Sequence, residues 1–154
     1  MNGARPRDPS RVSTRRRRNE LEHKIQSAVI EWRDLQVKQF PELELLHAIP
    51  NGAKLPYRKK LIHGRVVRVS REAKKLKKEG LTAGIPDLCW PVPRGRFHGL
   101  YIEAKTPTGD VNKDQARKHA LLIAQGYRVL VLRDPDAIIN AIKTYWGLGP
   151  FSLA

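Results

Sequence analysis

The chain has 154 residues, of which 40% are hydrophobic, and its 30 Lys and Arg against 15 Asp and Glu give a net charge of +15. This length suits one compact domain with extensions, and no apolar run approaches the roughly 18–20 residues that span a bilayer. The single cysteine, Cys89, excludes an internal disulfide and any zinc site built from several cysteines. We therefore expect a cytoplasmic protein, without a secretory signal because the Arg-rich amino terminus lacks an apolar segment.

The positive charge is concentrated in two segments. Residues 1–18 hold seven Arg and one Asp, a net charge of +6, and residues 54–79 hold eleven Lys or Arg and two Glu, a net charge of +9. The rest of the chain is therefore neutral. Such a local excess is typical of contacts to a polyanion, although a solvated charged surface is the alternative. The candidate nucleic-acid contacts are Arg15, Arg16, Arg17, Arg18, Lys59, Lys60, Lys74, Lys75, Lys77 and Lys78.

The amino-terminal segment and the first helix differ in composition. Residues 1–18 combine Pro, Gly, Ser and Arg with almost no large apolar side chain, which predicts a disordered basic arm. We take residues 19–154 as the folded domain. Apolar side chains at helical spacing predict an amphipathic helix over residues 20–38, with Asn19 as its N-cap.

The middle of the chain combines a strand signal with a basic insert at residues 54–79. Apolar residues over 43–49 suggest a strand that ends at a Pro-Asn-Gly turn. Residues 53–69 have only weak strand signals and are expected to be irregular. Residues 70–79 resemble a short basic helix, with Ser70 as its cap.

Strands and helices alternate in the second half of the chain. Candidate strands occupy residues 87–92 and 100–105, and a turn between them predicts a hairpin. A helix over residues 112–125, an apolar strand of the buried type over 127–132 and a closing helix over 135–146 follow. This order predicts an α/β fold with a central mixed β-sheet flanked by helices.

Acidic residues stand at the ends of two of these apolar runs. Asp87 follows Gly-Ile-Pro, while Glu103 and Lys105 are two residues apart in Tyr-Ile-Glu-Ala-Lys. The strand period of two places Glu103 and Lys105 on one face. Two carboxylates and an ammonium can hold a divalent cation beside an attacking water and a phosphate, with the Ala104 carbonyl as a further ligand. The alternative is a surface strand with a cross-strand ion pair.

Four other polar residues have both a functional and a structural interpretation. Gln115, ten residues after Lys105, could contact the nucleophilic water or a phosphate, or could be an exposed helix glutamine. Glu22 could be a third metal-binding acid, or a capping or solvated glutamate. His47 and Asn51 flank the segment His-Ala-Ile-Pro-Asn-Gly and could face the substrate, although a strand-end histidine and a turn asparagine need no function.

The ordered set Gly-Ile-Pro-Asp, Tyr-Ile-Glu-Ala-Lys and Asp-Gln resembles a PD-(D/E)xK nuclease, and more narrowly the VRR-NUC (virus-type replication-repair nuclease) family. The similarity covers about residues 20–146 and includes His-Ala-Ile-Pro-Asn-Gly and the strand Gln-Gly-Tyr-Arg-Val-Leu-Val. The resemblance implies a restriction-endonuclease-like core. It implies a metal-binding role for Glu22, Asp87 and Glu103, and a catalytic role for Asp87, Glu103, Lys105 and Gln115.

The resemblance also implies an activity, namely Mg²⁺- or Mn²⁺-dependent hydrolysis of DNA phosphodiesters without a covalent intermediate. Short stand-alone members are similar to phage proteins that act on branched DNA, sometimes as dimers. We therefore expect branched or junction DNA as the substrate, a role in phage replication, recombination or repair in the host cytoplasm, and a homodimer as one assembly option. Two alternatives stay open, a sequence-specific restriction-type endonuclease and a non-catalytic nucleic-acid-binding accessory protein.

Overall fold

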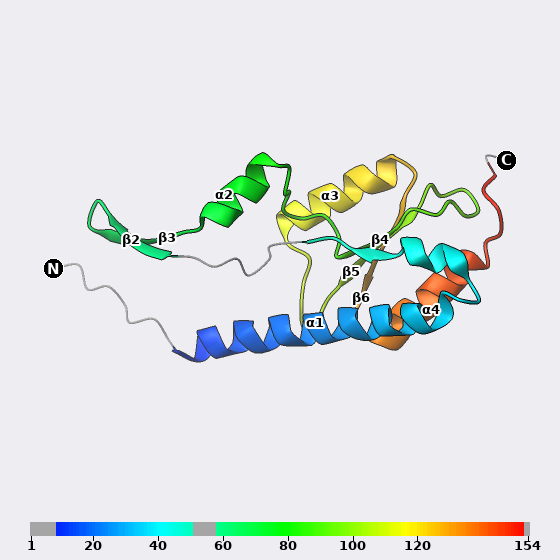
Figure 1. The fold of residues 1–154 in the computed structure, drawn as a ribbon, viewed down its shortest axis with the longest axis horizontal. Helices are drawn as coiled ribbons and strands as arrows, with labels where there is room; N and C mark the ends of the chain where they lie inside the picture. The colour runs from blue at the N-terminus through cyan, green and yellow to red at the C-terminus, as the bar shows by residue number, and fades with distance from the viewer. Residues whose placement is uncertain (1–8, 51–57, 153–154) are drawn as a thin grey trace.

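The computed structural model describes residues 9–50 and 58–152 of the chain. A mixed four-stranded sheet forms the centre, and helices cover its two faces (Figure 1). None of the described helices is both long and apolar enough to cross a membrane. In chain order the elements are helix α1 (Pro9–Gln36), the 3-10 helix η1 (Pro41–Leu45), strands β1 (His47–Ala48), β2 (Arg58–Ile62) and β3 (Arg65–Val69), helix α2 (Arg71–Lys78), strands β4 (Leu88–Trp90) and β5 (Leu100–Ala104), helix α3 (Lys113–Ala124), strand β6 (Arg128–Leu132) and helix α4 (Pro135–Trp146).

The central sheet has the order β1-β4-β5-β6. Strand β4 runs antiparallel to β1 and β5, whereas β6 runs parallel to β5 after the crossover through α3. Strand β5 lies inside the sheet, so its residues Leu100, Ile102, Glu103 and Ala104 are all buried. The sequence predicted a mixed sheet flanked by helices, and the fold confirms it.

The apolar core lies between the sheet and the pair of helices α1 and α4, which pack together on one face (Figure 1). Helix α3 covers the other face. Helix α4 contributes Tyr145, whose hydroxyl donates a hydrogen bond of 2.8 Å to the Val92 carbonyl. The core side chains are Ile25 and Val29 of α1, Leu43, Leu46, Leu88, Trp90, Val92, Leu100, Ile102 and Ala104 of the sheet and its connections, and Ile138, Ile142 and Tyr145 of α4.

A separate unit projects away from this body. Strands β2 and β3 pair only with each other, and α2 follows them directly. No side chain of β2 or α2 is buried. Figure 1 shows this unit at the same end of the molecule as the amino-terminal half of α1, so the described parts of the two basic segments lie at one end.

Two expectations about the amino-terminal half were wrong. Helix α1 begins at Pro9 and continues through Asn19, so residues 9–18 are helical instead of a disordered arm, and residues 1–8 lie outside the described part. Arginine is a good helix former, and apolar spacing marks only the part of a helix that packs. The strand expected over 43–49 is reduced to β1 and follows η1, because the buried Leu43 and Leu46 are three residues apart, the 3-10 period.

Two further strands differ from expectation. The segment expected to be irregular forms the β2–β3 hairpin, because His63 and Gly64 take positive φ angles of 48° and 72°, as a type I′ turn requires. Strand β6 was expected to be fully buried, but every residue in it is only half-buried. It lies at the edge of the sheet, where only one neighbouring strand covers it.

Candidate active site

Asp87 is positioned by a tight loop that runs against the amino end of α3. Gly84 has φ +86°, and a Cβ atom at this position would lie 2.9 Å from both the carbonyl carbon and the oxygen of Asp114. Only glycine fits both restrictions without strain. The loop leads through the buried Pro86 to Asp87, immediately before β4, where its Oδ2 accepts a hydrogen bond of 2.9 Å from the Ala104 backbone N–H.

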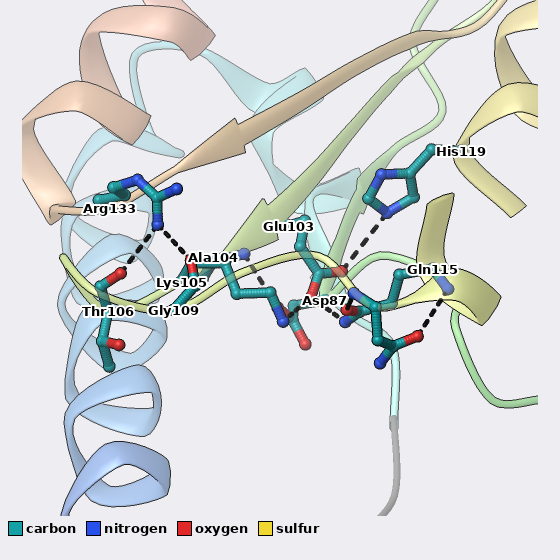
Figure 2. A network of polar contacts seen from close by, with 10 residues as sticks. Asp87, Glu103, Ala104, Lys105, Thr106, Gly109, Gln115, His119 and Arg133 are labelled. Carbon is teal, nitrogen blue, oxygen red and sulfur yellow. Dashed lines mark hydrogen bonds and ion pairs between the residues drawn. The ribbon is translucent and has the colours of Figure 1, made fainter. Parts of the chain in front are cut away.

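Glu103 lies on β5 with only 1% of its surface exposed and forms the centre of a polar network (Figure 2). The ammonium of Lys105 lies 2.7 Å from Oε1 of Glu103. The side-chain amide of Gln115 also donates a hydrogen bond to Oε1. The second oxygen, Oε2, is buried and has no hydrogen-bond partner among the described residues. Glu103 therefore keeps one buried oxygen without a hydrogen bond within the described part of the chain.

Gln115 is held in place by the first turn of α3. Its Oε1 accepts a hydrogen bond of 3.0 Å from the Asn112 N–H, and its own N–H donates one of 3.0 Å to Oδ1 of Asn112. This reciprocal pair is a capping box that fixes the start of the helix. The amide nitrogen is thereby directed at Glu103, so the contact joins α3 to β5.

The two carboxylates disfavour each other in the absence of a cation. Burial raises the pKa of Asp87 to about 6, and the nearby charges of Glu103 and Glu22 add to this effect. Burial also raises the pKa of Glu103, and the Lys105 ammonium opposes this effect only in part. The charge of Glu22 raises both pKa values, so this α1 side chain acts electrostatically on the same site.

His119 is a member of this network that the sequence reasoning missed. It follows Gln115 by one helical turn, and its buried Nε2 lies 3.7 Å from Oε2 of Glu103, without a hydrogen-bond partner among the described residues. Burial lowers the pKa of His119, and the Lys105 charge acts in the same direction, so the imidazole is neutral near pH 7. The i, i+4 spacing from Gln115 was the available signal.

Arg133 is a second missed residue, and it anchors the loop between β5 and α3. Its Nη1 donates hydrogen bonds of 2.9 Å to the Thr106 carbonyl and 2.5 Å to the Gly109 carbonyl (Figure 2). Because this loop connects Lys105 to the first turn of α3, the guanidinium stabilises the backbone on which two site residues depend. An arginine after an apolar strand has no local pattern that would indicate this role.

The family model of the VRR-NUC domain matches residues 11–134 of this chain. The chain belongs to the VRR-NUC domain family. A solved structure described as a "VRR_NUC domain protein" is similar with a TM-score of 0.65 and 28% identity, over 85% of this chain and 92% of that chain. No curated protein matches the chain. Membership of this family makes the protein a nuclease of the PD-(D/E)xK type with DNA as its substrate, as the sequence predicted.

Most of the residues predicted for the VRR-NUC site lie in one network. Contacts link Glu103 to Lys105 and to Gln115, and Asp87 to the Ala104 backbone. Gln115, for which an exposed position was the alternative, is half-buried and bonded to a carboxylate. Within residues 9–50 and 58–152, no three His, Cys, Asp or Glu side chains are close enough to hold a metal ion by themselves. The roles predicted for Glu22 and the Ala104 carbonyl as ligands stay predictions.

The predicted DNA contacts are distributed over the projecting elements. Lys59 and Lys60 on β2 are exposed, as are four lysines on α2 and the arginines at 17 and 18 of α1. The side chains at positions 15 and 16 lie outside the described part, as does Asn51. His47 is exposed, and its Nδ1 lies 2.8 Å from the Leu45 carbonyl, so a role toward substrate stays a prediction. The α2 lysines are Lys74, Lys75, Lys77 and Lys78.

Proposed function

We propose that this VRR-NUC protein is a metal-dependent endonuclease that hydrolyses DNA phosphodiester bonds and selects DNA by structure. The observation that supports the proposal is the pair of acids Asp87 and Glu103, whose pKa values are both raised, beside the Lys105 ammonium. A buried carboxylate pair of this kind is unfavourable by itself, and a divalent cation would remove the penalty.

The donor set fits a hard divalent cation. Asp87 and Glu103 supply carboxylate oxygens, and Oε2 of Glu103 is buried without a hydrogen-bond partner. Mg²⁺ is commonly held by one or two carboxylates together with waters and substrate phosphate, so a complete set of protein ligands is not required. We propose Asp87 and Glu103 as direct ligands, with Glu22 and the Ala104 carbonyl completing the site. A bound Mg²⁺ or Mn²⁺ would polarise a phosphoryl oxygen and acidify a bound water.

The remaining residues act on substrate and water. We assign Lys105 to the negative charge that develops on the phosphate, because a compact ammonium offers three donors in adjustable directions. Gln115 holds the Glu103 carboxylate through its amide, and its ordered position in the capping box makes that support rigid. His119 packs on the other side of Glu103 as a neutral group and limits the movement of the carboxylate.

The charge distribution supports recognition of the DNA backbone. Exposed cations on α2, on β2 and near the amino end of α1 extend toward one end of the molecule, which is also the end that the start of α3 faces (Figure 1). Contacts to phosphates position a protein without reading sequence. We therefore favour structure-selective cleavage, of branched DNA in phage replication, recombination or repair within the host cytoplasm, over a restriction-type activity. A homodimer would present two such sites to one junction.

The test is cleavage of end-labelled duplex, flap, four-way-junction and single-stranded DNAs, with Mg²⁺, with Mn²⁺ and with EDTA. We expect cleavage only with added metal, and faster cleavage of branched DNA than of intact duplex. Asp87→Asn should abolish it, whereas Asp136→Asn, which removes an exposed acid from α4, should leave it unchanged. Binding without cleavage under every metal condition would instead favour the non-catalytic alternative.

A further inference from the structure

The free end of the β2–β3 hairpin places two exposed apolar side chains opposite each other. Leu61 pairs with Val66 one step before the turn at His63–Gly64. These side chains are 74% and 67% exposed. Residues that face each other across two strands lie on the same side of the ribbon. The hairpin therefore presents an apolar pair at its tip that no part of the described chain covers.

The apolar pair contributes little to the stability of the fold. Every residue of β2 is exposed, and the hairpin forms a sheet of only two strands, separate from the central sheet. An isolated two-stranded hairpin is marginal in water, because neither face buries enough apolar area. Serine or threonine at these positions would cost the isolated protein little. The exposed apolar character of Leu61 and Val66 therefore points to a binding partner that covers the tip of the hairpin.

The chemistry around the pair indicates a polyanion as the binding partner. Lys59 is two residues before Leu61 and shares its face, while Lys60 and Arg65 lie on the opposite face. No acidic residue occurs from position 58 to position 71. A protein partner that covered the apolar pair would need acidic side chains around an apolar surface to compensate these cations. DNA offers apolar base faces and phosphates together.

We propose that Leu61 and Val66 form an apolar wedge that inserts where base stacking in DNA is interrupted, at a nick, gap or branch, while Lys59 and Lys60 contact the flanking phosphates. A two-stranded ribbon is narrow enough to enter a DNA groove. An apolar side chain that inserts into DNA must separate stacked bases. The free-energy cost of this separation is lowest where stacking is already broken. The inference rests on the proposed function and names the feature of DNA that the enzyme selects.

The test measures binding in EDTA, so that cleavage does not enter. The full chain is titrated into an intact duplex and into the same duplex with a single-nucleotide gap, each with 2-aminopurine beside the central position. The fluorescence of 2-aminopurine reports unstacking, and anisotropy reports affinity at several salt concentrations. The wedge variant is Leu61→Ser/Val66→Ser, and the matched charge variant is Lys59→Gln/Lys60→Gln. Thermal melts verify that both variants retain the wild-type stability.

The two variants should fail differently. The wild type should bind gapped DNA more tightly and raise its 2-aminopurine fluorescence. The wedge variant should lose roughly tenfold or more in affinity for gapped DNA, because burial of even one apolar side chain contributes about 1.5 kcal/mol, with an unchanged salt slope and no fluorescence rise at saturation. The charge variant should bind both DNAs more weakly with a salt slope smaller by about 1.8, yet still raise the fluorescence at saturation.

Other results would overturn the wedge. One is a full fluorescence rise with the wedge variant, and another is the absence of a rise or of gap preference in the wild type. A dimer seen by sedimentation that disappears in the wedge variant, without an effect on DNA, would assign the tip to self-association. Metal-dependent cleavage by the wedge variant on an intact duplex shows separately that the proposed nuclease function holds, whichever result the wedge gives.

Discussion

Replacement of Asp87 by asparagine should make the metal-free protein more stable at neutral pH, although Asp87 belongs to the site. The pKa of Asp87 is raised to about 6 because burial and the charge of Glu103 disfavour its ionised form. Asparagine has nearly the same shape, and its oxygen can still accept the hydrogen bond that the Ala104 N–H donates to Oδ2. The variant therefore removes the charge and keeps the contact.

The size of the effect follows from the pKa shift. A rise from 3.8 to about 6 corresponds to roughly 3 kcal/mol of free energy of unfolding above pH 6. Because the folded-state pKa lies above the unfolded value, the folded state binds the proton more tightly. Wild-type stability therefore falls as pH rises from about 4 to about 6. The variant also loses a charge-assisted hydrogen bond, which lowers its free energy of unfolding by about 1 kcal/mol. The net gain in stability of Asp87→Asn is therefore about 1–3 kcal/mol at neutral pH and close to zero near pH 4.

The assay is thermal and urea denaturation in EDTA across the range from about pH 4 to about pH 7.5. A gain of this size should raise the melting temperature by about 2–10 °C for a chain of this length. Asp110→Asn, which changes an exposed acid, is the matched control and should show no pH-dependent gain. Added Mg²⁺ should stabilise the wild type and the control, but not Asp87→Asn. A destabilised Asp87→Asn protein at pH 7.5, or a difference that does not depend on pH, would refute the reasoning.

Three further variants test the network and its support. Lys105→Met leaves the Glu103 carboxylate buried without its ammonium. We expect the cleavage rate to fall by orders of magnitude. In urea denaturation the free energy of unfolding should fall by about 3 kcal/mol at neutral pH and by less in acid. An unchanged cleavage rate would leave only a structural ion pair. His119→Leu keeps most of the side-chain volume and removes a ring nitrogen that makes no hydrogen bond in the described part. The free energy of unfolding should change by less than about 1.5 kcal/mol, while single-turnover cleavage should slow. An unchanged cleavage rate would mean that the imidazole only fills space. Gly84→Ala should lower stability by about 1–3 kcal/mol more than Gly80→Ala in thermal melts, because both glycines have positive φ but only the first approaches backbone atoms. Equal losses would show that the loop is free to move away from α3.

Local chemistry in the sequence was sufficient for much of the secondary structure. Ser70 was predicted to cap α2, and its hydroxyl accepts a hydrogen bond of 3.1 Å from the Ala73 N–H. Asp134 stands directly before the predicted start of α4 at Pro135, and its carboxylate accepts a hydrogen bond of 2.8 Å from the Ala137 N–H. Such signals are reliable because the partner lies three residues away. The hairpin turn at His63–Gly64 was missed because His-Gly is not one of the Asn-Gly, Asp-Gly or Gly-Gly pairs that mark a type I′ turn in a sequence.

The sequence by itself indicated the family and predicted the kind of site, since the spacing of Asp87, Glu103 and Lys105 in apolar strands and the family resemblance both pointed to these residues, and their catalytic roles stay predictions. The structure decided how the site is assembled. It showed that Gln115 donates to Glu103, that His119 packs behind the same carboxylate and that the loop of Asp87 rests on α3. These contacts join residues of different elements, and their geometry depends on how α3 packs on the sheet. Periodicity and capping describe a chain over a few residues, whereas burial and charge pairing depend on the whole fold.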